Sequence, residues 1–179
     1  MRDRESPVDG SRRASPAAGQ PSPTALTLYF APGSSSMAPH IALHEVGEPF
    51  DARPVSFARH EQRDEAFLRI NPQGKVPVLL VGTQALTEVA AILYFLAQRH
   101  PQARLWPHDD PIAQARVISW MSFLASTVHP ARRQGIDHAR RVWGLAERRL
   151  AEAPWAVGEF GIADIHLFRL FWRMRSSLH

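Results

Sequence analysis

The stretch of the chain that could bind a ligand most directly is centred on the dipeptide Val76-Pro77. Proline cannot donate a hydrogen bond to a sheet ladder. Pro77, between the turn at Gly74 and the apolar run at 78–81, therefore predicts the first residue of a strand. A cis bond at such a position is typical of a tight turn. The backbone N–H and C=O of Val76 would then face outward, where an extended peptide can pair with them as an added antiparallel strand.

A second binding feature follows in the sequence. Gly82-Thr83 is typical of a hairpin turn, and Thr87-Glu88 precedes a helix that carries Ile92, Phe95 and Leu96 at helical spacing. The N-terminus of a helix attracts anionic groups because its first N–H groups have no partner within the helix. The sequence therefore predicts a site for an anionic group close to the backbone of Val76.

Three consecutive serines, Ser34, Ser35 and Ser36, form the next candidate. They follow a short apolar segment at 26–30 and precede a helix that is expected to run to Val46 and to stop at Gly47. Serine is a favoured N-cap residue, so on the residues alone any of the three could cap this helix.

The elements that must position these residues form a recognisable order. Strands are predicted over 26–30, over 51–57, over 78–81 and from Ala85, and helices up to Val46, over 61–70 and after Glu88. The order β-α-β-α-β-β-α is that of the thioredoxin fold, with its last two strands antiparallel.

Two segments carry a resemblance to a known family. NPQGKVPVLL at 71–80 and LTEVAAILYFLA at 86–97 closely resemble the glutathione-binding half of bacterial glutathione transferases, the beta-like class in particular. The likeness extends from about Leu26 to Phe168. It implies that Val76, next to Pro77, pairs its backbone with the cysteinyl part of glutathione. Glu88 and the N–H of Val89 would hold the γ-glutamyl end, without the hydroxyl that the class often has at the latter place.

The same resemblance implies the catalytic residues. In PGSSSMAPHIALHE at 32–45, Ser35 stands at the class's cysteine and Ser36 at its following serine, beside the sulfur of glutathione. His129 stands where a histidine of the class faces that sulfur, and a positive imidazolium there favours a thiolate. A histidine near a helix C-terminus can equally be a partner of the helix dipole. The chain has no cysteine, and so no redox-active thiol of its own.

The second half of the chain is predicted to be helical. Its first helix is expected over 111–128. The predicted buried stripes are Val117, Trp120, Met121, Leu124 and Val128, and later Val142, Leu145 and Leu150. Arginines between 132 and 149 predict either a polyanion-binding patch or a solvated helix face. Gly161 takes the capping position of the class's core-helix motif, and Asp164 is expected to return a bond to that cap, which is a structural role.

These patterns divide the chain of 179 residues into a disordered tail at 1–24, an α/β thioredoxin-like domain at 25–100, a linker at 101–110 and a shortened all-α domain at 111–179. The tail could instead be an organelle or export address. Because later helices of the class are expected to be missing, the apolar residues Leu167, Leu170, Phe171 and Trp172 are predicted to be partly exposed. Such a patch implies a partner, a dimer or poor stability.

The resemblance implies a cytoplasmic glutathione transferase of detoxification, which conjugates the glutathione thiolate to a small soft electrophile and needs no metal or other cofactor. It also implies a homodimer whose interface includes the helix after Glu88. The net charge of +4 comes without a nucleic-acid-binding motif, so we expect no nucleic-acid partner. The longest apolar run is too short to cross a bilayer, so we expect no membrane association either. A non-catalytic glutathione transferase-like binding module, or a truncated and weakly active product, is the alternative.

Overall fold

The first half of the protein is built on a four-stranded sheet. The computed structural model describes residues 25–151 and 153–178, so the predicted tail at 1–24 lies outside the described residues. The strands are β1 (Leu26–Phe30), β2 (Phe50–Pro54), β3 (Val78–Val81) and β4 (Gln84–Thr87). Their order is β2-β1-β3-β4; β1 and β2 are parallel, and the other two pairs are antiparallel. The four predicted strands are present and the last two are antiparallel as predicted, although β2 begins and ends earlier than predicted.

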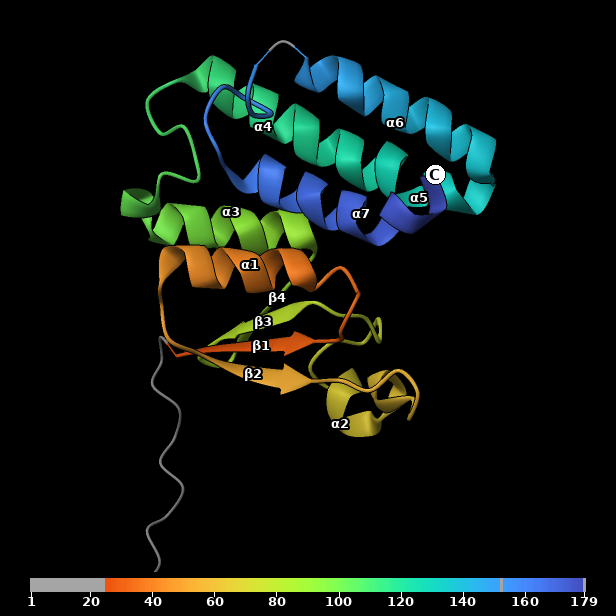
Figure 1. Cartoon of the computed structure of the whole chain (residues 1–179). Coiled ribbons are helices and arrows are strands. Elements are labelled where there is room, and N and C mark those ends of the chain that lie inside the picture. The colour runs from red at the N-terminus through yellow and green to blue at the C-terminus, as the bar shows by residue number, and fades with distance from the viewer. Residues whose placement is uncertain (1–24, 152, 179) are drawn as a thin grey trace, which may run out of the picture.

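Helices cover both faces of this sheet (Figure 1). Helices α1 (Met37–Val46) and α3 (Val89–Arg99) lie on one face, and the short η1 (Glu61–Arg63) and α2 (Glu65–Leu68) lie on the other. Helix α1 stops at Gly47, whose φ of 70° is the left-handed conformation that glycine adopts without steric cost. The thioredoxin-like order β-α-β-α-β-β-α is therefore present as predicted.

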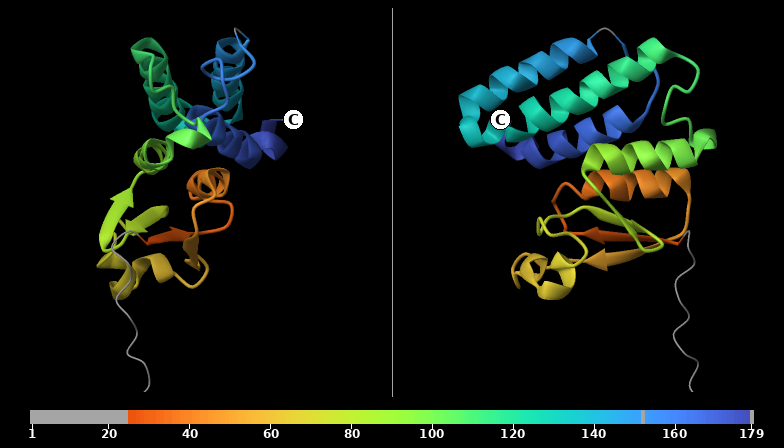
Figure 2. Two further views of the ribbon diagram at one scale, coloured as in Figure 1. Left: turned by 90° about the vertical axis from the view of Figure 1, so that its left-hand side faces the viewer. Right: turned by 180° about the vertical axis from the view of Figure 1, so that it is seen from behind.

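The second half is helical. After η2 (Pro101–Ala103) come α4 (Pro111–Phe123), the π-helical turn η3 (Leu124–Val128), α5 (His129–Ala131), η4 (Arg132–Gln134), α6 (Ile136–Leu150) and α7 (Ile162–Leu178). Helix α4 begins at Asp110, whose carboxylate accepts the N–H groups of Ile112 and Ala113. Figures 1 and 2 show α7 between the layer of α1 and α3 and the two outer helices, and α7 packs on all four.

One core runs through both halves. Leu28 and Leu96 of the first half belong to the same cluster of buried side chains as Trp120 and Ile165 of the second. All five residues predicted to form the buried stripe of the first C-terminal helix are buried.

The predicted stripe of α6 is partly wrong. Val142 is buried, but Leu145 is 44% exposed, and the residues that accompany Val142 inside are Ala139 and Ala146. These three positions share one face of the helix at spacings of three and four. Leu145 lies outside that face.

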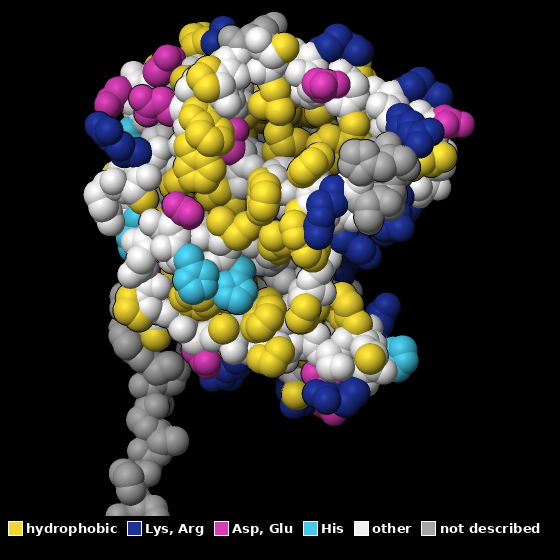
Figure 3. Space-filling model, in the orientation of Figure 1, with side chains coloured by type: hydrophobic (Ala, Val, Ile, Leu, Met, Phe, Trp, Pro, Cys, Tyr) yellow, Lys and Arg dark blue, Asp and Glu magenta, His cyan; other side chains and the backbone are white. Residues whose placement is uncertain are grey.

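The apolar residues of α7 are divided between the core and the surface. Leu167 and Leu170 are buried, which corrects the expectation that they are exposed, whereas Phe171 and Trp172 are exposed as predicted. Figure 3 shows apolar side chains gathered over the helical region on the face towards the viewer. Within the described ranges, no helix is both long and apolar enough to cross a membrane.

The turn before α7 is closed by its own aspartate. The Asp164 carboxylate accepts the N–H of Gly161 at 3.0 Å and that of Ala156 at 2.8 Å, so the predicted bond back to the cap is confirmed. Burial nevertheless raises the pKa of Asp164, because desolvation outweighs these hydrogen bonds.

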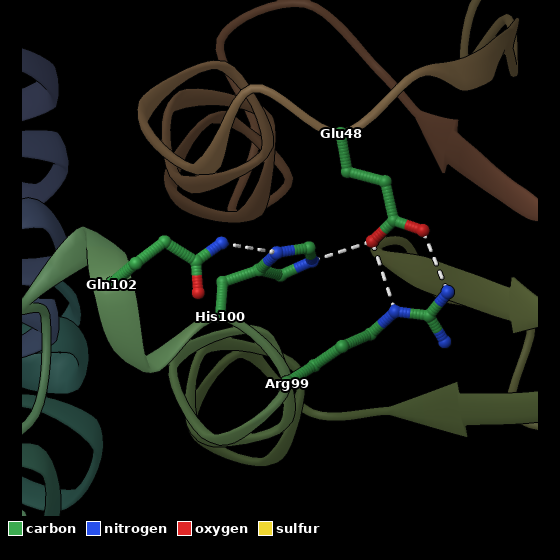
Figure 4. A network of polar contacts seen from close by, with 4 residues as sticks. All are labelled: Glu48, Arg99, His100 and Gln102. Atoms are coloured by element: carbon green, nitrogen blue, oxygen red, sulfur yellow. Dashed lines mark hydrogen bonds and ion pairs between the residues drawn. The ribbon is translucent and has the colours of Figure 1, made fainter.

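A polar network fixes the far end of α3 (Figure 4). Glu48, in the loop after α1, accepts hydrogen bonds from Arg99 Nε at 2.9 Å and Nη2 at 2.6 Å, and its Oε2 lies 2.5 Å from His100 Nε2. These side chains are largely shielded from water, so the pairing is stronger than that of an exposed ion pair. The network joins the loop after α1 to the C-terminal end of α3.

Candidate active site

The register of the sheet brings the predicted site residues to one end. Tyr29 of β1 lies opposite Val78 of β3, and Val78 lies opposite Thr87 of β4. The serine loop follows β1, Val76-Pro77 precedes β3 and Glu88 follows β4. These three segments therefore leave the sheet at the same end, although up to 54 positions separate them in the sequence.

Val76 is held by its side chain and not by its backbone. The Val76-Pro77 peptide bond is cis. The Val76 side chain is buried in a small cluster with Ala31 and Val78, among others. Within the part of the chain that the structure describes, neither the N–H nor the C=O of Val76 makes a hydrogen bond. As far as the described residues go, both groups can pair with an extended ligand.

The loop that leads to Val76 has its own support. Asn71 is buried, and its amide donates to the Lys75 carbonyl at 2.8 Å and accepts the Gln73 N–H at 3.1 Å. A side chain that bonds both arms of a turn fixes its conformation. Asn71 thereby positions Val76, a role that the sequence analysis did not assign.

Glu88 has an unusual backbone. It precedes α3 with φ 68° and ψ 128°, a combination that costs a residue with a Cβ about 1–3 kcal/mol. Its side chain does not cap α3, and it is exposed. An exposed carboxylate on a strained backbone, beside the N-terminus of a helix, is typical of a ligand-binding position. The neighbouring N–H of Val89 is the first of that helix.

The three serines have different partners. Ser36 is 1% exposed, and its Oγ accepts the Ala31 N–H at 3.1 Å and donates to the Ala31 carbonyl at 3.1 Å. Ser34 Oγ lies 2.7 Å from Ser36 Oγ and accepts the Ser36 N–H. Ser36, at the N-cap position of α1, makes no side-chain capping bond. The hydroxyls of Ser34 and Ser36 are therefore committed to closing the loop.

Ser35 faces the second half of the molecule. Its Oγ accepts a hydrogen bond from Arg169 Nη2, and Arg169 Nε donates to the Ser34 carbonyl at 3.4 Å. Arg169 belongs to α7 and is 4% exposed. Burial, with a smaller contribution from Arg173, lowers the pKa of Arg169 to about 10, so the guanidinium is still charged at neutral pH.

Arg169 was not singled out by the sequence analysis, but the sequence holds a signal for it. Arg169 lies three and four positions after His166 and Ile165, which themselves lie four and three positions after Ile162, so these buried residues share one face of α7. An arginine in an apolar stripe is rarely buried without a specific partner.

His129 lies near the same arginine. Desolvation lowers the pKa of His129, and the charges of Arg169 and Arg133 lower it further. The expected imidazolium is thus disfavoured, whereas the guanidinium that contacts the serine loop, that of Arg169, is charged at neutral pH. His166, also buried beside Arg169, has its pKa lowered to about 3, chiefly by desolvation.

Comparisons with known proteins agree with this geometry. Residues 24–98 match the model of the glutathione S-transferase N-terminal domain. The chain is 30% identical over 160 residues to glutathione S-transferase GstA of Escherichia coli O157:H7, covering 80% of this chain and 79% of the relative. It is 29% identical to a maleylacetoacetate isomerase of Pseudomonas aeruginosa, covering 75% of this chain and 74% of the relative. A glutathione transferase homologue from Sulfitobacter, solved with bound glutathione, is 32% identical with a TM-score of 0.75, covering 86% of this chain and 84% of that one.

Proposed function

This chain belongs to the glutathione S-transferase family, and on that premise we propose that it joins the thiolate of glutathione to a small soft electrophile. One observation supports the proposal: three groups lie at the same end of the sheet. They are the backbone of Val76, which has no hydrogen-bond partner among the described residues, the N-terminus of α3 and the hydroxyl of Ser35. A tripeptide with a thiol in its middle and a charged γ-glutamyl end matches that set of groups.

The binding roles follow from the groups that are free. The N–H and C=O of Val76 pair with the cysteinyl residue, which adds to the sheet as a short antiparallel strand. Pro77 keeps the Val76 backbone at the end of the sheet. Glu88 binds the γ-glutamyl ammonium, and the N–H of Val89, at the positive end of α3, binds the γ-glutamyl carboxylate. In this docking mode the thiol lies at Ser35.

The chemistry requires the anion, because the thiolate and not the thiol is the nucleophile. The Ser35 hydroxyl donates to the sulfur, and the thiol proton passes to water. The sulfur then forms a bond to an electrophilic carbon while a leaving group departs with its electron pair, or adds to an activated double bond whose neighbouring carbon takes up a proton. The rest of the rate acceleration comes from holding glutathione and the electrophile close together in the reactive orientation.

The test is the replacement Ser35→Ala. Because a hydrogen bond to a charged group contributes about 1.5–3 kcal/mol, losing it should raise the pKa of the bound glutathione thiol by about one to two units. The ultraviolet absorbance of the thiolate, recorded against pH, measures this. Ser122→Ala, at an exposed position of α4, is the matched control and should leave the titration unchanged. An unchanged titration in Ser35→Ala would refute the role of Ser35.

Isomerisation is the second candidate, favoured by the similarity to the maleylacetoacetate isomerase. It uses the same thiolate, which adds to a conjugated double bond, allows rotation about it and leaves again. Glutathione would then be unconsumed after turnover, whereas conjugation consumes one molecule per product.

A non-catalytic module that binds glutathione stays an alternative, favoured by the absence of any cysteine and by the commitment of Ser34 and Ser36 to their loop. Such a module would bind glutathione without forming a thiolate at neutral pH. The homodimer and the cytoplasmic location expected from the sequence stay predictions.

A further inference from the structure

We propose that Arg169 is a positioning residue of the thiol site: it turns the Ser35 hydroxyl into a donor for the glutathione thiolate and supplies the positive charge that this anion faces. The inference rests on the proposed function, since the anion is bound glutathione. It assigns to α7, in the second half of the chain, a part of the site that the first half alone does not contain.

The direction of the hydrogen bond carries the first step. A guanidinium can only donate, so Ser35 Oγ must be the acceptor in its bond to Arg169 Nη2. The hydroxyl proton of Ser35 is then left for another acceptor, and the described residues offer it none. A serine that accepts from a cation is also a stronger donor, because the charge polarises its hydroxyl.

The charge of Arg169 carries the second step. No carboxylate pairs with Arg169 among the described residues, and its Nη1 is buried without a hydrogen-bond partner. The titratable groups around it are Arg173 on its own helix, His129 on α5 and His166 one turn earlier, and none of them is acidic. A buried charge without a counter-charge is costly. An anion held at Ser35 supplies that counter-charge.

The third step is the anchoring of the guanidinium. Its Nε donates to the carbonyl of Ser34 while Nη2 donates to Ser35, so two donors on one edge of the group fix its orientation against the serine loop. The planar fork of arginine permits this double contact, and a lysine ammonium at the same place would lose part of it. Arg169 therefore acts through Ser35 and the loop.

The experiment compares Arg169→Met and Arg169→Lys with Arg175→Met in the full chain. Arg175 lies on the same helix, is exposed and stacks on Trp172, so it is the matched control. We expect Arg169→Met to raise the pKa of the bound glutathione thiol by about one unit or more, Arg169→Lys to raise it less, and Arg175→Met to leave it unchanged. The readout is again the thiolate absorbance against pH.

Two further measurements separate this role from a merely structural one. Binding of S-methylglutathione, which has no ionisable thiol, should change by less than about twofold in Arg169→Met, because only the anion responds to the charge. The melting temperature of unliganded Arg169→Met should not fall, because the substitution removes an uncompensated buried charge.

The outcomes are distinct. A wild-type protein that binds no glutathione would refute the proposed function and this inference together. A wild-type protein that forms the thiolate, with the same thiol pKa in Arg169→Met, would refute only the inference. Equal losses of glutathione and S-methylglutathione binding would assign Arg169 a structural role and overturn the proposal as well. If Arg169→Met does not fold, Arg169→Lys provides the test. An unchanged thiol pKa in Arg169→Lys would contradict the claim that the planar guanidinium of Arg169 is required.

Discussion

Ser35 and Ser36 are adjacent residues with the same side chain, and the fold gives them opposite surroundings. Ser36 bonds back to Ala31 inside the loop, while Ser35 meets an arginine 134 positions away. Local sequence could predict that a serine cluster precedes a helix, because N-cap preferences are local. It could not predict which hydroxyl bonds within the loop and which one meets the arginine, since these contacts form only when the chain has folded.

The docking mode makes a prediction at the level of a single ligand atom. Glutathione methylated on its cysteinyl nitrogen cannot donate a hydrogen bond to the Val76 carbonyl, and we expect it to bind about tenfold more weakly or worse, as the loss of about 1.4 kcal/mol implies. Isothermal titration calorimetry measures both affinities on an unchanged protein.

The matched protein control for this prediction is Val76→Ala. It keeps the backbone donor and acceptor and removes only part of a buried side chain, so it should lower stability while retaining binding. Equal affinities for glutathione and its N-methyl analogue would contradict the proposed pairing.

His166 predicts a pH dependence of stability. Its pKa is lowered from 6.5 to about 3 in the folded protein, so between these values the unfolded chain binds the proton and the folded one does not. Stability must therefore fall as the pH is lowered from about 6.5. At pH 4.5 this residue should account for a loss of about 3 kcal/mol relative to pH 7.

The variant His166→Leu isolates that contribution. Both ring nitrogens of His166 are buried without hydrogen-bond partners, so we expect the variant to unfold at pH 7 with a free energy within about 1 kcal/mol of the wild type. At pH 4.5 it should be the more stable of the two. Denaturant unfolding at both pH values gives the comparison, and identical losses in the two proteins would contradict the assignment.

At the scale of elements, the sequence predicted most where its patterns were strong. The strand of alternating Leu26 and Leu28, the helix ended by Gly47 and the stripe from Val117 to Val128 are set by local spacing. The stripe of α6 was not, because three alanine and valine positions compete with leucines for the buried face. Which face of α6 becomes buried depends on how the helix packs against its neighbours.

At Gly161, the start of α7, the structure reverses the effect on stability that the sequence suggests for a serine. Serine is the better N-cap residue, so the sequence suggests that Gly161 costs a few tenths of a kcal/mol relative to serine. A Cβ at Gly161, however, would lie 2.9 Å from the Leu105 carbonyl oxygen, a backbone atom that also accepts the Ile162 N–H. We therefore expect Gly161→Ser to lower the free energy of unfolding by about 1–3 kcal/mol.

Denaturant unfolding of purified Gly161→Ser measures that change. Gly144→Ala is the control, because a Cβ at Gly144, inside α6, meets only the end of the Arg148 side chain at 3.6 Å. It should raise stability by about 0.5–1 kcal/mol. A stabilised Gly161→Ser would show that the capping bond outweighs the close contact.

At the scale of the whole molecule, one buried cluster runs through both halves. The buried cluster contains residues of β1, α1, α3, α4 and α7, so we expect a single cooperative thermal transition and not one for each half. Glutathione at about a hundred times its dissociation constant should raise the stability of that transition by about 2.7 kcal/mol. Two transitions, of which only one responds to glutathione, would contradict the shared core.

The surface of the whole molecule was predicted less well than its core. Phe171 and Trp172 of α7 are exposed as expected, but the expectation that later helices are missing had wrongly placed the buried Leu167 and Leu170 with them. The contact between Arg169 and the serine loop was not predicted, since it depends on how α7 packs against the other half of the chain.

The most direct test of the central claim is the ionisation of glutathione in the complex with the wild-type protein. Thiolate absorbance recorded from pH 5 to 9 should give an apparent pKa of about 6.5, roughly two units below that of a free thiol at about 8.5. That result would mean that Ser35 and Arg169 hold an anion ready to attack an electrophile. A bound thiol that ionises near 8.5 would contradict the claim and leave a protein that binds glutathione without activating it.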